Sequence, residues 1–361
     1  MERQDKMIKP PYKVPTMAQI QDLPWNGYKV ASTFSGGGGS CLGYRMAGYK
    51  VIYANEFVPA AQETYKANHP NSFLDTRDIR TVHASDILET LNLKPGELDI
   101  LDGSPPCSAF STAGSREAGW GKSKKYSDNQ VQRVDDLFFE YARLLNGLQP
   151  KVFVAENVSG LIKGTAKGYF KKILAELKSC GYQVSCRLLD SQWLGVPQAR
   201  QRTIFVGVRN DLNLIPSHPK PMPYNYIVEE SLRDIKDPTQ AEYRPIGQAT
   251  STLNLWHHTR PGDNFAVASL KLKGKASYFN QTKVSLYKPA PTITATAQAY
   301  HWSEPRYLTI PEVRRLCSFP DDFILEGNFL QQWERMGRSV PPLMMKVIAS
   351  HIAMEILSCA A

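Results

Sequence analysis

The chain has 361 residues, of which 42% are hydrophobic and 21% charged, and it carries a formal net charge of +9. This composition is that of a folded globular protein, and the positive charge is compatible with a polyanionic partner. No uninterrupted apolar run is long enough to span a bilayer, and the N-terminal stretch MERQDKMIKPPYKVP lacks the apolar segment of a secretory signal, so we expect a cytoplasmic protein without a membrane partner. The six cysteines are scattered and include no C-x-x-C pair, so we expect neither a metal site nor a disulfide framework.

Short apolar strands alternate with amphipathic helices up to about residue 208. We predict strands over residues 29–34, 51–55, 98–102, 151–155 and 203–208, with helices over 135–147 and 169–180. Periodicity fades from residue 210 to about 305, and helical character returns over 310–317 and 343–357. This order predicts an α/β fold, a doubly wound and mainly parallel sheet interrupted by a smaller, irregular insert. Residues 1–28 are expected to form an extended arm with one short helix.

The first predicted strand runs into four consecutive glycines, VASTFSGGGGSCLGYRMAGY. A flexible linker would have polar flanks, whereas this run lies between an apolar strand and a helix. A tight turn of this kind aims backbone N–H groups at a ligand. Glu56 ends the next strand, 20 residues after Gly36, at the distance typical of a carboxylate that binds ribose hydroxyls. The third glycine of the dinucleotide fingerprint is missing, which favours a nucleoside cofactor without a pyrophosphate. A purely structural turn is the alternative.

Two further strand ends carry candidate chemistry. The stretch LDILDGSPPCSAFS places Cys107 directly after two prolines, which end the strand and fix the backbone that presents the thiol. The stretch KVFVAENVSGL ends in Glu156. The carboxyl ends of parallel strands meet at one edge of a sheet, where α/β enzymes hold their ligands. A small core cysteine and a solvated turn carboxylate are the alternatives.

Seven stretches in this order resemble the motifs of the DNA (cytosine-5)-methyltransferases of prokaryotic or phage type. They are FSGGGGS, GSPPCSAFS, LFFEYARLL, AENVSGL, QARQRTIFVGVR, RYLTIPEVRRLCSFP and GRSVPP, and they cover residues 30–208 and 306–355. The resemblance implies an S-adenosylmethionine-dependent, Rossmann-like methyltransferase fold. It also implies methyl transfer to C5 of a cytosine in duplex DNA, with S-adenosylhomocysteine as the product.

The resemblance assigns four catalytic residues. Cys107 is the nucleophile that adds to cytosine C6 and makes C5 nucleophilic. Glu156 acts at N3, where the addition pushes charge. Arg200 and Arg202 lie near the base, although two exposed arginines are an ordinary alternative. Because the target carbon faces the interior of a duplex, the cytosine has to swing out of the stack.

The resemblance also implies the cofactor site. Phe34 would pack near the adenine, Glu56 would bind the ribose, Asp78 would meet the adenine amine, and Ser339 would lie near the methionine end. The full predicted set is Phe34, Ser35, Gly36, Gly38, Gly39, Glu56, Phe57, Asp78, Ile79, Pro105, Leu137 and Ser339.

DNA contacts are predicted in two segments. Residues 108–128, rich in Gly, Ser and Lys, fit a lid over the flipped base, with a disordered surface loop as the alternative. The insert carries lysines with interleaved aromatic residues, a pattern typical of a surface that follows a nucleic-acid backbone but also of a solvated lysine-rich face. The predicted DNA-binding set is Ser111, Lys122, Lys124, Lys125, Lys271, Lys273, Lys275 and Lys283.

Four segments follow from this assignment. They are an arm (1–28), a catalytic domain (29–209), a target-recognition domain (210–305) and a C-terminal part that completes the catalytic domain (306–361). We expect a monomer acting on double-stranded DNA in a bacterial or phage-infected cell, within a restriction–modification system with an independent cognate endonuclease or as a solitary enzyme. Two departures from the family pattern are Ser108, in place of Gln, and Arg338, in place of Asn. An RNA-directed methyltransferase and an inactive DNA-binding homologue, the latter supported only by Arg338, remain open.

Overall fold

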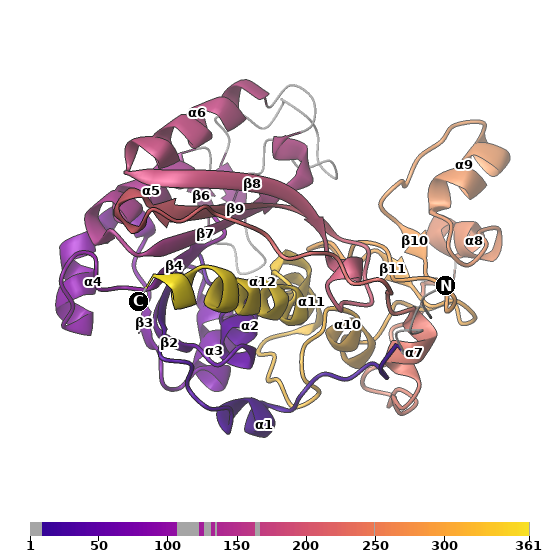
Figure 1. Cartoon of the computed structure of the whole chain (residues 1–361). Helices are drawn as coiled ribbons and strands as arrows, with labels where there is room; N and C mark the ends of the chain where they lie inside the picture. The colour runs from indigo at the N-terminus through magenta and orange to yellow at the C-terminus, as the bar shows by residue number, and fades with distance from the viewer. Residues whose placement is uncertain are drawn as a thin grey trace, which may run out of the picture.

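A seven-stranded sheet forms the centre of the computed structural model, which describes residues 9–106, 123–125, 131–133, 136–162, 167–248 and 250–360 (Figure 1). The strand order is β3-β2-β1-β4-β7-β9-β8. The strands are β1 Lys29–Thr33, β2 Lys50–Asn55, β3 Phe73–Asp75, β4 Ile100–Gly103, β7 Val152–Val158, β8 Tyr182–Asp190 and β9 Gln201–Arg209. The pairs from β3 to β7 are parallel, whereas β9 is antiparallel to both of its neighbours. The predicted doubly wound, mainly parallel sheet is confirmed.

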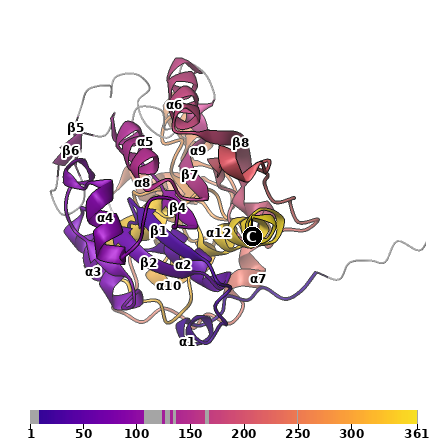
Figure 2. The same cartoon turned by 60° about the vertical axis from the view of Figure 1, so that its left-hand side comes forward.

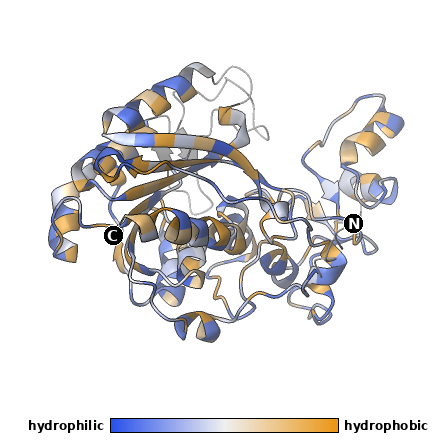
Figure 3. Ribbon diagram, in the orientation of Figure 1, coloured by the Kyte–Doolittle hydropathy of each residue, from blue (hydrophilic) through white to orange (hydrophobic). Residues whose placement is uncertain are grey.

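Helices cover both faces of the sheet (Figures 1 and 2). One group is α2 Gly39–Met46, α3 Pro59–Asn68 and α12 Pro342–Glu355; the other is α4 Ala84–Leu91, α5 Leu137–Leu148 and α6 Lys167–Ser179. Neighbouring strand residues alternate between two cores, because successive side chains point to opposite faces of a strand. Val30 packs with the first group of helices and Ala31 with the second. Figure 3 shows the hydrophobic colour concentrated on the central strands and on the helix sides turned toward them, whereas β8 is mixed in colour.

The strand order reverses between β1 and β4, which are buried over almost their whole length. Chains that leave the carboxyl ends of two such strands turn in opposite directions and leave a crevice between them. The glycine loop follows β1, and residues 104–106 follow β4. The reversal therefore places both candidate motifs at one crevice.

The insert has short elements, at the right of Figure 1. They are α7 Val228–Leu232, α8 Ser251–His257, α9 Phe265–Lys273, β10 Thr282–Lys283 and β11 Ala299–Tyr300. Val228 and Leu232 of α7 pack in the core around Phe319 and Trp333, whereas α8, α9 and Tyr300 of β11 surround a separate core. Trp256, Phe265 and Tyr300 are central to that core, and Phe265 stacks on Tyr300 at 4.8 Å between ring centroids. The prediction of an irregular insert missed these helices, which are too short to show a clear periodicity.

The remaining elements are one helix of the N-terminal arm, a short strand pair and two helices near the C-terminal end. The arm contains α1 Met17–Gln21, as predicted; β5 Ser123–Lys125 and β6 Val131–Arg133 form an antiparallel pair; and α10 Ile310–Leu316 and α11 Phe329–Arg338 lead into α12. By length and hydropathy the stretch Phe329–Cys359 could cross a membrane, but 56% of its apolar window is buried inside the protein. Extended backbone at Ser339 separates α11 from α12 within it.

Candidate active site

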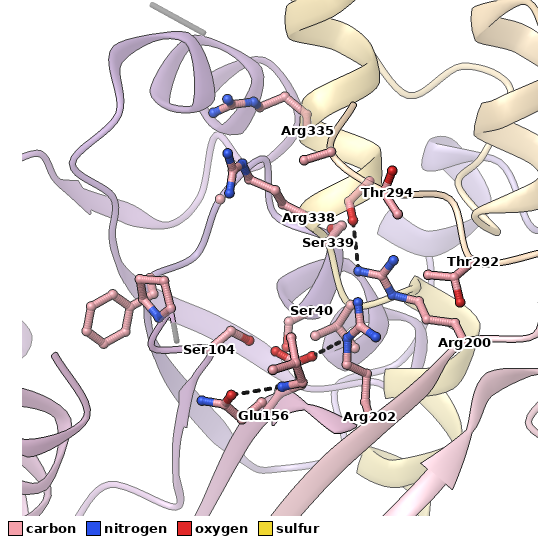
Figure 4. A pocket seen from close by; sticks show the side chains of 18 of the residues that line it. Ser40, Ser104, Glu156, Arg200, Arg202, Thr292, Thr294, Arg335, Arg338 and Ser339 are labelled. Carbon is pink, nitrogen blue, oxygen red and sulfur yellow. Dashed lines mark hydrogen bonds and ion pairs between the residues drawn. The ribbon is translucent and has the colours of Figure 1, made fainter. Parts of the chain in front are cut away.

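A cleft of about 950 Å³ opens at the carboxyl ends of β1, β4 and β7 (Figure 4). One wall consists of the glycine loop and the ends of β1 and β2. A second wall consists of the start of β9 and the junction between α11 and α12. The insert supplies the third wall, through Phe279, Asn280 and Thr282 and through six residues between 291 and 298. The predicted cofactor region and the predicted base-binding region are therefore parts of one cavity.

The glycine loop is closely packed on its outer side. A Cβ on Gly38 would lie 2.2 Å from His69 Nε2, and one on Gly39 would lie 2.0 Å from Ser339 Oγ. Gly36 and Gly38 also have positive φ angles, +56° and +91°, which glycine adopts without strain. Side chains at Gly38 and Gly39 would push the loop away from His69 and Ser339. The run is thus a packed turn rather than a linker.

Glu56 holds this loop in place. Its Oε2 accepts the N–H of Gly36 at 2.7 Å, and its Oε1 accepts the N–H of Val58 at 2.7 Å. Burial raises the pKa of Glu56, while the bond from Val58 and the charge of Arg335 oppose that rise. Each oxygen keeps a second lone pair, so the carboxylate can still accept ribose hydroxyls. Sequence reasoning predicted the ribose contact but missed the bond to the loop.

The cleft includes eight of the twelve predicted cofactor residues. They are Phe34, Ser35, Gly36, Glu56, Phe57, Ile79, Pro105 and Ser339. Gly38 and Gly39 pack against His69 and Ser339. Asp78 caps the 3₁₀ helix Ile79–Thr81 and pairs with Arg80 at 3.3 Å, and Leu137 is fully buried at the start of α5. Those four residues are not among the lining residues.

Glu156 and Arg202 form an ion pair in the same cleft, with 2.7 Å between Glu156 Oε1 and Arg202 Nε. Both side chains are largely buried, at 11% and 13% exposed. Burial lowers the pKa of Arg202, and the charge of Glu156 opposes the fall. The next residue of β7 is Asn157, whose Nδ2 donates to the carbonyl of Pro105 at 3.2 Å, so β7 is bonded to the segment that leads to Cys107.

Arg200 takes a different role from Arg202. It is 2% exposed, and its two terminal nitrogens donate to the carbonyls of Ile293 (2.8 Å) and Gly337 (2.9 Å). Burial and the neighbouring charge of Arg202 lower the pKa of Arg200 to about 9. Within the described part of the chain, its Nε has no hydrogen-bond partner. Arg200 therefore joins the end of the insert to α11, and Arg202 is the arginine that contacts Glu156.

Some predicted residues lie outside the described residues. These are Cys107, Ser111 and Lys122, together with most of the predicted lid over 108–128. For Lys124 and Lys125 the structure describes the backbone alone, in β5. The described chain reaches the cleft at Pro105 and Pro106, which both line it, directly before Cys107.

The lysines of the insert fall into two groups. Lys271, Lys273 and Lys275 are exposed at and just beyond the end of α9. Lys283 is only 7% exposed: its ammonium lies 3.5 Å from the Trp256 ring centroid and donates to the Trp256 carbonyl at 3.3 Å. Lys283 is therefore no surface contact for a phosphate, contrary to the prediction.

Arg338, at the family's Asn position, lines the cleft and is anchored to its own helix. Its Nε donates to Glu334 Oε1 at 2.7 Å, and Arg335 Nη2 donates to the other oxygen of Glu334 at 2.9 Å. Figure 4 shows both arginines extending from α11 on the side away from Arg200 and Arg202. Sequence reasoning missed Arg335 and also missed Asp102, a carboxyl in an otherwise apolar strand that lines the same cleft.

A family model and two similar curated proteins all point to the same family, the DNA methylases. The model of the C-5 cytosine-specific DNA methylases matches residues 28–354. The Type II methyltransferase M.NgoFVII of Neisseria gonorrhoeae is 31% identical over 88% of this chain and 84% of its own length. M.NgoPII of the same species is 29% identical over 93% and 98%.

Two solved structures share the fold. A protein described as a DNA modification methyltransferase encoded within an E. coli prophage is 23% identical and matches with a TM-score of 0.70, over 92% of this chain and all of that one. The Spodoptera frugiperda DNMT2 mutant is 18% identical and matches with a TM-score of 0.63, over 92% and 99%.

Proposed function

Because the chain belongs to the C-5 cytosine-specific DNA methylase family, we propose that it methylates a flipped-out cytosine in one specific duplex sequence through a covalent adduct of Cys107. The enzyme is a DNA cytosine-5 methyltransferase, and S-adenosylmethionine is its methyl donor. The observation that carries the finer proposal is the Glu156–Arg202 ion pair, which shares one cleft with the glycine loop.

The residues of the cleft fit a nucleoside bearing a methionine arm. The glycine loop and Glu56 offer N–H groups and a carboxylate, while Phe34 and Ile79 offer apolar contact. When bound, S-adenosylmethionine supplies an electrophilic methyl group. Phe34, Glu56 and Ser339 would hold it, with Gly36 shaping the loop.

The protein's own residues activate the base. The Cys107 thiolate adds to C6, and the negative charge that develops on the ring reaches N3. Glu156 takes a proton from the solvent and delivers it to N3, while Arg202 holds the Glu156 carboxyl in position through the 2.7 Å contact. C5 of the resulting enamine is nucleophilic. After C5 is methylated, a base takes the C5 proton, the C6–S bond breaks to release the Cys107 thiolate, and N3 returns its proton to Glu156.

The insert is proposed to read the DNA. We assign residues 210–305 to target recognition, with residues 29–209 and 306–361 forming the catalytic domain and residues 1–28 an arm. Phe279, Asn280 and Thr282 of the insert line the cleft, which supports recognition and chemistry at one opening. We further propose that the enzyme acts as a monomer in a bacterial or phage-infected cell, within a restriction–modification system with an independent endonuclease or as a solitary methyltransferase. The Type II names of its relatives favour the first of these two settings.

The substrate class can be tested by offering labelled S-adenosylmethionine with duplex DNA and, separately, with tRNA. We expect label at C5 of cytosine in the duplex alone. Transfer to tRNA alone would contradict a DNA substrate. The absence of transfer to either, from a folded protein that binds duplex DNA, would favour the inactive homologue and make Arg338→Asn the first reversion to try.

Replacing Glu56 with alanine should weaken S-adenosylmethionine binding by about 1.5–3 kcal/mol, because a charged acceptor for the ribose is lost. The substitution also frees the N–H of Gly36, so the loop loses its tie. Calorimetry measures the affinity, and Glu63→Ala, on the exposed side of α3, is the matched control. Unchanged affinity in a folded Glu56→Ala protein would remove Glu56 from the cofactor site.

Changing Lys271, Lys273 and Lys275 together to glutamine should weaken binding to cognate and unrelated duplexes alike. Exposed ammonium groups that contact phosphates release counterions, so the slope of log K against log salt should flatten by about three units. Titrations at several salt concentrations measure that slope. The same change in charge at Lys171, Lys172 and Lys178, on the exposed side of α6, should leave it unchanged. A slope that stays constant in the first variant would place its three lysines in solvent.

A further inference from the structure

A buried carboxyl lies at the floor of the cleft and has no role in the chemistry described above. Asp102, on β4, is 2% exposed and lines the cleft. Its Oδ2 accepts hydrogen bonds from Ser40 Oγ (2.8 Å) and Ser32 Oγ (3.0 Å), and its Oδ1 accepts one from the Tyr44 hydroxyl at 3.3 Å. Figure 4 draws Ser40 in the cleft, in the same view as Ser104 and Glu156.

The hydroxyl groups link Asp102 to both ends of the glycine loop. Ser40 lies just after the loop, in the first turn of α2. Ser35, before the loop, donates to Ser32, which in turn donates to Asp102. Ser35, Ser40 and Asp102 all line the cleft. The carboxyl is therefore adjacent to the segment proposed to hold the methyl donor.

No cation pairs with Asp102 among the described residues. The three side chains that donate to it are hydroxyls, and the titratable groups that face it are Cys41 and Tyr44 of α2, Tyr141 of α5 and Glu156 of β7. Burial raises the pKa of Asp102 to about 7, the serine and tyrosine bonds oppose the rise, and the charge of Glu156 adds to it. A carboxyl without a cation, beside a cavity, favours a ligand that brings positive charge.

We propose that Asp102 is the anionic partner of the donor's sulfonium, and that it loses its proton to the solvent when the donor binds. The inference rests on S-adenosylmethionine as the donor, but not on the covalent mechanism. The product, S-adenosylhomocysteine, has the same nucleoside and amino-acid ends with a neutral thioether in place of the sulfonium. Asp102 therefore favours the donor over the product and helps the spent product to leave.

Donor affinity should increase with pH. A cation binds the ionised carboxyl more tightly, so donor affinity rises as the pH increases through 7 and levels off above about 8. Product affinity lacks this component. Because a group with a pKa near 7 is about half protonated at pH 7, donor binding should release roughly half a proton more than product binding.

Calorimetry on the wild-type protein at pH 7, in two buffers of different ionisation enthalpy, measures the protons released with S-adenosylmethionine and with S-adenosylhomocysteine. The expected result is an excess of about half a proton for the donor at pH 7 that disappears at pH 8.5. Equal proton release with the two ligands would overturn the proposal. This measurement uses the wild-type protein and needs no variant.

The substitution Asp102→Asn keeps the shape and removes the charge. We expect it to abolish the excess proton and to weaken donor binding about tenfold, while product binding changes less than about threefold. Asp99→Asn removes a buried carboxylate that bonds Lys151 and the backbone of Lys29 instead, so its proton release should match the wild type. Equal weakening of donor and product would show that Asp102 only shapes the loop. An excess proton that persists in Asp102→Asn would assign it to another group.

Discussion

Replacing Cys107 with serine should abolish methyl transfer to DNA while leaving donor binding intact. A serine hydroxyl is far less ionised than a thiol at neutral pH and is a weaker nucleophile toward C6. The residues proposed to hold the donor, Phe34, Glu56 and Ser339, belong to other segments of the chain, so donor binding should not require this side chain. Incorporation of labelled methyl groups measures the first expectation, and calorimetry with S-adenosylmethionine measures the second.

A matched cysteine provides the control for that substitution. Cys359 is exposed at the C-terminal end of the chain and lines no part of the cleft, so Cys359→Ser should keep full activity. Methyl transfer by Cys107→Ser at the wild-type rate would show that the nucleophile is elsewhere.

Replacing Glu156 with glutamine should lower kcat by about 10²–10⁴-fold, the range typical for the loss of a positioned proton donor. Glutamine keeps an oxygen that can accept from Arg202, so the local geometry should survive, but an amide has no proton to deliver to N3. Steady-state kinetics separate kcat from KM. The control is Glu140→Gln, on α5, where the carboxylate pairs with Arg143 outside the cleft. A change in KM alone would make Glu156 a binding residue and not an acid.

The central strands could be predicted from the sequence because they are buried and uninterrupted. The structure has a strand at each of the five predicted places, and the glycine loop lies between β1 and α2 as expected. The edge strands were missed for physical reasons. β3 has only three residues, and β8 carries a mixed sequence, YQVSCRLLD, whose side chains are mostly half-buried.

Side-chain roles depended on packing that sequence spacing does not contain. Arg200 and Arg202 looked equivalent in QARQR, yet only Arg202 faces Glu156. The antiparallel register explains this, because Val158 lies opposite Arg202 and Glu156 is its neighbour on the same side of β7. In the sequence Lys283 cannot be distinguished from the exposed lysines of the insert. In the folded chain its ammonium lies over the Trp256 ring.

The sequence contains an indication of the role of Asp102 that the prediction of the site omitted. An aspartate inside the apolar run LDILDG requires hydrogen-bond partners if the strand is buried. Those partners, Ser32, Ser40 and Tyr44, come from β1 and α2, and only the folded chain brings them to β4.

The proposed mechanism requires a bond between the Cys107 sulfur and cytosine C6, and duplex DNA with 5-fluorocytosine at the target should trap that bond. Once C5 carries the methyl group, release of the sulfur needs loss of a C5 proton, and fluorine cannot leave in its place. The protein should remain attached to the DNA through denaturing electrophoresis in a reaction that requires S-adenosylmethionine, and digestion should place the attachment on the peptide containing Cys107. An adduct that maps to another residue, or that persists in Cys107→Ser, would contradict the mechanism, as would the absence of any adduct from a wild-type protein that methylates the same sequence without fluorine.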